Sequence, residues 1–277
     1  MFRFKPQKKQ RTAEEEVLDS YNSNLSKKIL NFNFIFQQDV VDDLAKIQRW
    51  RIPSDESIEL SSSICAGICY WSALTLLGVE KKPIVKFIQE IYNPKKGIKH
   101  KLGVNHTNFI KQVRLNHAEF YGLGLNPFRE QDLVKFKEYG GYAGKDAEGF
   151  FKRNYESIHN TSSATDVILG EGGLAIVSIQ EGFNGYSPNY HDVLVLGKNP
   201  NDETYLIFDP DARVNFNTQK NRPVGIKFLT KKSRLYTVNK DYLNQNTYRE
   251  KPSPGGITIG LFSSDKIKPN SAAGSED

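Results

Sequence analysis

Two cysteines and a few well-placed histidine and aspartate side chains are the chain's candidates for nucleophilic chemistry. Both cysteines, Cys65 and Cys69, lie in residues 61–78, where a short polar lead precedes an apolar run that Gly78 can end. This pattern predicts a buried helix with Cys65 in its first turn. The unpaired N–H groups and positive dipole at a helix start stabilise a thiolate. The sequence therefore predicts Cys65 as a nucleophile with a lowered pKa.

His191 is the candidate base, because it opens an apolar strand after residues 181–190, which are predicted to form a long loop bordering a substrate cleft. Asp209 closes the next predicted strand. Adjacent antiparallel strands place the start of one beside the end of the next, so the two side chains are expected to be neighbours. A carboxylate orients an imidazole and stabilises the imidazolium, which holds a nearby thiol as thiolate. The sequence therefore predicts a triad of Cys65, His191 and Asp209.

No cofactor or metal ion is predicted. The other histidines fall in polar or helical segments, where solvated side chains are expected: His100, His106, His117 and His159. Two cysteines one helical turn apart and a single well-placed histidine fall short of the four ligands of a structural zinc site. The same spacing is poor for a stabilising disulfide, so both cysteines are predicted to be reduced thiols.

The elements that position these residues change in type along the chain. Helical spacing predicts helices over residues 13–19, 40–49, 65–78, 81–92, 107–116, 130–139 and 147–158. Apolar runs predict strands over residues 174–179, 191–197 and 204–209, with further strands at 224–230, 235–238 and 256–262. Residues 29–36 fit either a strand or an amphipathic docking segment. The order predicts an α+β protein in which the nucleophile-bearing helix packs on an antiparallel sheet.

Composition sets the domain organisation. With 277 residues, of which 38% are hydrophobic, the chain supports one main core. We expect a basic tail and helical extension in residues 1–50, a catalytic domain in 51–262 and a disordered tail in 263–277.

The charge pattern excludes some partners. The net charge of +6 is spread along the chain without an arginine-rich, aromatic-interleaved stripe, so no nucleic acid partner is predicted. Weak attraction to an anionic membrane surface is compatible with this charge. No transmembrane segment and no secretory signal peptide are predicted, as for a cytosolic chain.

Three motifs resemble those of the papain-like fold, and most closely those of the YopT-like bacterial effector cysteine proteases. They are, in chain order, Cys65-Ala-Gly-Ile-Cys-Tyr-Trp, His191-Asp-Val-Leu-Val-Leu and Phe208-Asp-Pro-Asp. The resemblance implies a papain-like cysteine protease, a hydrolase with a Cys65, His191, Asp209 triad. It also implies a virulence role in a host cell, with delivery by a specialised secretion system into the host cytosol. Its substrate would be a host protein, and small GTPases are the family precedent.

Several alternatives stay open. Deamidases and transglutaminases share the same chemistry, and bacteriocin-processing peptidases share the nucleophile spacing. Cys69 is the rival nucleophile, since Cys69-Tyr-Trp-Ser-Ala also resembles the papain signature. A catalytically inert, papain-like binding protein is the remaining reading. Its support is that no Gln or Asn stands shortly before Cys65, where many papain-like enzymes carry an oxyanion-hole donor.

Overall fold

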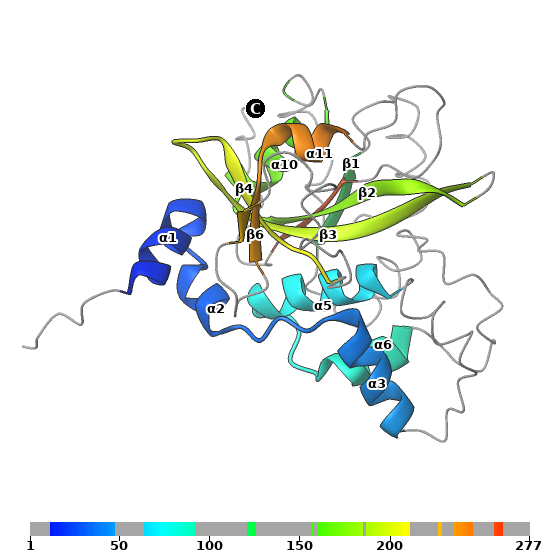
Figure 1. Cartoon of the computed structure of the whole chain (residues 1–277). Helices are drawn as coiled ribbons and strands as arrows, with labels where there is room; N and C mark the ends of the chain where they lie inside the picture. Colours follow the sequence, from blue (N-terminus) through cyan, green and yellow to red (C-terminus); the bar gives the residue numbers. More distant parts are fainter. Residues whose placement is uncertain are drawn as a thin grey trace, which may run out of the picture.

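The computed structural model places helices on both faces of an antiparallel sheet (Figure 1). It describes residues 12–47, 64–91, 121–125, 157, 160–184, 187–210, 227–228, 235–245 and 258–262. Within these residues the sheet has seven strands in the order β1-β7-β2-β3-β4-β6-β5. The strands are β1 (Tyr121–Leu125), β2 (Leu174–Asn184), β3 (Ser187–Asn199), β4 (Thr204–Phe208), β5 (Lys227–Phe228), β6 (Leu235–Val238) and β7 (Thr258–Phe262). The helices are α1 (Ala13–Asn22), α2 (Ser26–Asn31), α3 (Gln37–Ile47), α5 (Cys65–Leu76), α6 (Ile84–Ile91), α10 (Thr161–Gly170) and α11 (Lys240–Gln245).

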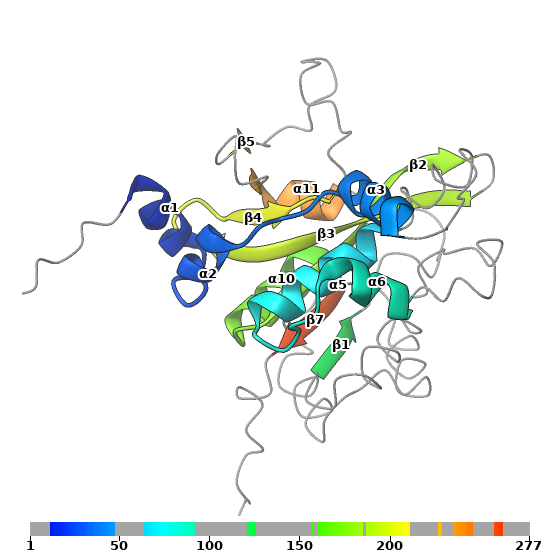
Figure 2. The same ribbon diagram turned by 90° about the horizontal axis from the view of Figure 1, so that it is seen from below.

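The central strands are apolar on both faces because each face is covered by helices. Along β2, Leu174 and Ile176 belong to the core shared with α5, whereas Ala175 and Val177 belong to the core shared with α10. Side chains in a strand alternate between the two faces, so a continuous apolar run fits a strand that is buried on both sides. Figure 2 shows α3, α5 and α6 gathered on one face of the sheet.

Helix α5 is the most deeply buried helix of the described chain. Eleven of its twelve residues are buried, and the exception is Thr75. The helix ends as expected near Gly78, whose φ of 82° is accessible to glycine at little cost. There the N–H of Val79 donates to the carbonyl of Leu74 at 2.9 Å. The predicted buried helix headed by Cys65 is therefore confirmed.

The segment 12–47 wraps around the sheet and α5. Near its start, the Tyr21 hydroxyl pairs with the Thr204 hydroxyl at 2.7 Å. The ring of Phe34 then packs on that of Phe208, with 4.7 Å between centroids. At the start of α3, the N–H of Gln37 donates to the carbonyl of Pro210 at 3.0 Å. The apolar residues of this segment thus share one core with α5.

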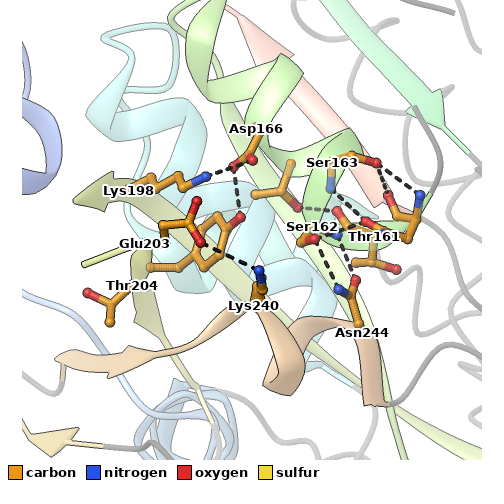
Figure 3. Close-up of polar contacts among 12 residues, drawn as sticks. Thr161, Ser162, Ser163, Asp166, Lys198, Glu203, Thr204, Lys240 and Asn244 are labelled. Atoms are coloured by element: carbon orange, nitrogen blue, oxygen red, sulfur yellow. Dashed lines mark hydrogen bonds and ion pairs between the residues drawn. The ribbon is translucent and has the colours of Figure 1, made fainter. Parts of the chain in front are cut away.

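Polar contacts fix α10 and α11 on the opposite face, as Figure 3 shows. Asp166 on α10 accepts hydrogen bonds from Lys198 and from the Tyr205 hydroxyl, both at 2.8 Å. Asn244 on α11 accepts from the Ser162 N–H at 3.0 Å and donates to the Ser162 hydroxyl at 3.0 Å. These bonds pair the polar groups at the border of the core that β2 shares with α10.

The sequence predicted the class of this fold correctly, because mixed helix and antiparallel sheet is what the structure contains. Residues 29–36 prove to be the end of α2 followed by an extended stretch that docks Phe32 and Phe34 on the core. Strand β1 and helices α10 and α11 were not predicted. The helices expected over 107–116 and 130–139, almost all of the one expected over 147–158, and the tail 263–277 lie outside the described residues.

The predicted long loop over 181–190 is wrong. Strands β2 and β3 extend through most of it as a hairpin arm, with Asn184 opposite Ser187. A register shift between Gln180 and Gly182 absorbs the irregular sequence as a bulge. Pro188 stands opposite Phe183 in this pairing. Glycine and proline therefore mark a bulged arm here and not a loop.

No helix in the described part of the chain is long and apolar enough to cross a membrane.

Gly197 provides a test of how the N-terminal segment docks. A Cβ at this position would lie 2.4 Å from the carbonyl oxygen of Tyr21, so α1 must move in Gly197→Ala. We expect a loss of about 1–3 kcal/mol in the free energy of unfolding, measured by urea denaturation. Gly170→Ala is the matched control, because nothing lies within 4 Å of the added methyl group. Equal stability of the two variants would contradict this docking.

Candidate active site

The two cysteines lie against one strand of the sheet. Cys65 is the first residue of α5, and its Sγ atom lies 3.9 Å from Oδ2 of Asp192 on β3. Cys69 lies one turn further into the helix, where its Sγ lies 3.3 Å from the backbone carbonyl oxygen of Asp192. Both are free thiols. The start of α5 is thus seated directly on β3.

His191 and Asp209 meet as the sequence predicted. Nε2 of His191 lies 2.6 Å from Oδ1 of Asp209, and the two residues are 5% and 3% exposed. The pairing of β3 with β4 causes this contact, because Leu194 stands opposite Phe208 and Asp209 directly follows. His191 lies inside β3, opposite Ile179, and does not open the strand as expected. The neighbouring strands therefore bring together residues 18 positions apart.

The charges of this pair determine how His191 titrates. Burial lowers the pKa of His191, but the charge and hydrogen bond of Asp209 act against burial. A hydrogen bond with Cys65 adds to the effect of Asp209, and the pKa of His191 is raised well above its usual value. A buried carboxylate thus holds the imidazole as imidazolium. The side-chain contact with Cys65 also places the thiol beside the ring.

The pKa of Cys65 is raised, in contrast to the prediction from its place at a helix start. Burial is the main cause, since this residue is only 1% exposed, and the charge of Asp192 acts in the same direction. The hydrogen bond and charge of His191 lower the pKa but do not outweigh burial. Burial also raises the pKa of Cys69, well above its usual value. Desolvation thus outweighs the hydrogen bond and charge of His191 at the Cys65 thiol.

The chain was compared with protein families, curated proteins and solved structures. No protein-family model, curated protein or solved structure matches the chain.

The geometry has to be interpreted from the residues themselves. The structure brings Cys65, His191 and Asp209 together, whereas the four other histidines lie outside the described residues. Among the described residues, no group of three or more histidine, cysteine, aspartate and glutamate side chains could hold a metal ion. A thiol, an imidazole and a carboxylate are the groups that nucleophilic acyl transfer uses, so these three residues are suited to that chemistry.

Sequence reasoning missed two residues of this cluster. Asp192 is buried beside Cys65, and its Oδ1 accepts a 2.6 Å hydrogen bond from the Ser178 hydroxyl. A signal was present, since aspartate is rare in strands that are apolar on both faces. Asp192 was not singled out because it is the second residue of the His191 motif, which was compared with the family motif as a unit.

The stability of the protein should depend on pH through His191. A pKa raised by folding contributes stability that is fully present below about pH 6.5 and is lost as pH rises through the folded-state pKa. We therefore expect the free energy of unfolding to fall with rising pH above about 6.5, measured by urea denaturation at several pH values. Asp209→Asn removes the charge that raises the pKa, so this slope should flatten. The same slope in both proteins would contradict the assignment.

The reactive thiol should be Cys65 and not Cys69. We expect brief treatment with limiting iodoacetamide to label Cys65 first, because burial raises the pKa of both thiols but His191 opposes the rise at Cys65, whereas the pKa of Cys69 is raised well above its usual value. Mass spectrometry shows which of the two cysteines is alkylated first. Cys69→Ser should keep the labelling rate and Cys65→Ser should lose it. Predominant labelling of Cys69 would overturn the assignment.

Proposed function

We propose that this protein is a cysteine protease or a related thiol acyl-transfer enzyme with Cys65 as nucleophile. The observation that supports this best is the 2.6 Å contact between His191 and Asp209 beside the Cys65 thiol. In this proposal His191 carries the proton and Asp209 orients the imidazole. Three buried, chemically complementary side chains from three separate elements are costly to bring together without a function.

We propose further that the fold is papain-like. A buried helix headed by the nucleophile packs on an antiparallel sheet whose neighbouring strands supply His191 and Asp209. The three sequence motifs occur in the order that the family resemblance implies. The fold and the motifs therefore support the same proposal from independent observations.

The proposed reaction has two steps. The Cys65 thiolate attacks a carbonyl carbon, the carbonyl electrons move to oxygen, and the backbone N–H of Cys65 helps to hold the oxyanion. As the tetrahedral intermediate collapses, His191 donates its proton to the departing amine, which leaves a thioester on Cys65. Water then attacks the thioester while His191 accepts its proton, and the acid departs as the Cys65 thiolate re-forms beside the imidazolium.

The nitrogens of His191 have separate roles in this scheme. Nε2 bonds Asp209, so Nδ1 is the nitrogen that exchanges the proton with the thiol. Asp209 is itself almost completely buried, which strengthens its interaction with the ring. The carboxylate therefore fixes the ring orientation throughout the cycle and stabilises the imidazolium in the stages where His191 is protonated.

Deamidation and transglutamination use the same three groups and differ only in leaving group and acceptor. The family resemblance favours proteolysis of a host protein, with a small GTPase as the class of substrate. It also favours delivery of the chain as a virulence effector into the host cytosol by a specialised secretion system.

An inert binding protein on the same fold is the second candidate, and one observation favours it. The Cys65 thiol is buried, and its pKa is raised. Both features slow the formation of a thiolate. Rapid modification of Cys65 by a thiol-reactive electrophile would exclude an inert site, because an unreactive buried thiol would be labelled only on unfolding.

The proposed function predicts new products in a lysate of host cells. We expect wild-type protein to generate new peptide termini, or one-dalton deamidation shifts, that are absent with Cys65→Ala, measured by quantitative proteomics. Cys69→Ser is the matched control and should keep the products. Asp209→Ala should retain its circular dichroism spectrum but reduce the products strongly. Identical peptide profiles for wild type and Cys65→Ala would contradict an acyl-transfer function.

A further inference from the structure

Asp192 touches both cysteines of α5. Its Oδ2 lies 3.9 Å from Sγ of Cys65, and its backbone carbonyl lies 3.3 Å from Sγ of Cys69. Its other carboxylate oxygen, Oδ1, accepts a 2.6 Å hydrogen bond from the Ser178 hydroxyl. Asp192 is 2% exposed. A buried carboxylate is therefore held in a fixed position beneath the first turn of the helix.

Ser178 and Asp192 form a cross-strand pair in a part of the sheet that is otherwise apolar. They stand directly opposite each other in the register of β2 and β3. The next pair on the same face, Ile176 and Leu194, belongs to the apolar core under α5. Two apolar side chains would satisfy this packing without the cost of burying a carboxylate. The polar pair thus stands at the position of the sheet where Asp192 contacts the Cys65 thiol.

We propose that Asp192, braced by Ser178, is a positioning residue that keeps the proton on the Cys65 sulfur in the resting site. The inference deepens the proposed function, because it assigns a restraint to the proposed nucleophile. The Cys65 thiol lies between two groups of opposite effect. The carboxylate of Asp192 accepts a hydrogen bond from the Cys65 S–H and repels a thiolate, whereas the imidazolium of His191 attracts a thiolate.

Among the described residues, the titratable groups at and behind the Cys65 thiol come from β3, from the residue after β4 and from α5 itself. Asp192 and His191 belong to β3, Asp209 lies behind His191 at the end of β4, and Cys69 is the neighbouring thiol on α5. Burial raises the pKa of Cys65 most, and the charge of the Asp192 carboxylate, whose Oδ2 lies 3.9 Å from the sulfur, adds to this rise, whereas a backbone hydrogen bond of Asp192 lowers the pKa. The restrained thiol would form a thiolate at a higher pH than the His191–Asp209 pair alone would permit.

The test measures the rate at which iodoacetamide alkylates Cys65 in the full-length chain, with mass spectrometry of the modified residue. The pH is varied from roughly 5 to 10, a range that surrounds the usual thiol pKa. Asp192→Asn keeps the shape and an acceptor for Ser178 but removes the charge. We expect the midpoint of the pH profile to fall by about one unit, which gives roughly tenfold faster alkylation below both midpoints. Asp166→Asn, which removes a carboxylate on the opposite face of the sheet, should leave the midpoint unchanged.

Ser178→Ala is the second variant and decides the question if Asp192→Asn fails to fold. Removing the hydroxyl releases the carboxylate from its fixed position beside the Cys65 sulfur, so the midpoint should fall in the same direction by a smaller amount. Circular dichroism establishes that each variant is folded. An unchanged or raised midpoint in folded Asp192→Asn, or in folded Ser178→Ala where Asp192→Asn does not fold, would overturn the proposal.

This outcome can be separated from a failure of the proposed function. Alkylation requires no substrate, so the profile reports the restraint on Cys65 even if wild-type protein produces no new termini in a lysate. Conversely, wild-type protein could produce new termini while the pH profile of Asp192→Asn stays unshifted. That result would contradict the role of Asp192 and leave the proposed function standing.

Discussion

The burial of eleven of the twelve residues of α5 is the constraint on which the rest of the structure depends. A helix that is apolar on every face needs cover on every face, and one sheet can cover only one. The sheet supplies one side, α6 packs on another, and the segment 12–47 encloses much of the remainder. The segment reaches Pro210, next to Asp209, through the N–H of Gln37. The N-terminal segment is thus part of the structure that surrounds the site.

The same burial determines the electrostatics of the site. It brings Cys65, His191, Asp192 and Asp209 out of water, where the charges of neighbouring groups act strongly. The short bond between His191 and Asp209 compensates for the desolvation of that pair. No such compensation dominates at Cys65, where burial and Asp192 together outweigh the effect of His191. The proposed nucleophile is therefore a thiol whose activation needs more than its place at a helix start.

Much of the site followed from local patterns. The apolar run after Cys65 fixed the helix and its end at Gly78, because an all-apolar segment can only be buried. The short turn between β3 and β4 fixed the approach of His191 and Asp209, because hairpin geometry alone places them at the same end of the sheet. The hairpin arm was not predicted from residues 181–190, since a bulge and a loop use the same glycines and prolines.

The sequence by itself determined the mixed class of the fold, the buried helix headed by Cys65 and the pairing of His191 with Asp209, because each depends on periodicity or on a short connection. Only the tertiary structure decided how deeply Cys65 is buried, that Asp192 and Ser178 lie beneath it, and that the N-terminal segment docks beside Asp209. These features depend on contacts between segments more than 100 residues apart, as between Cys65 and Asp192, which are separated by 127 positions. No local pattern encodes such a contact, and the desolvation that raises the pKa of Cys65 follows from it.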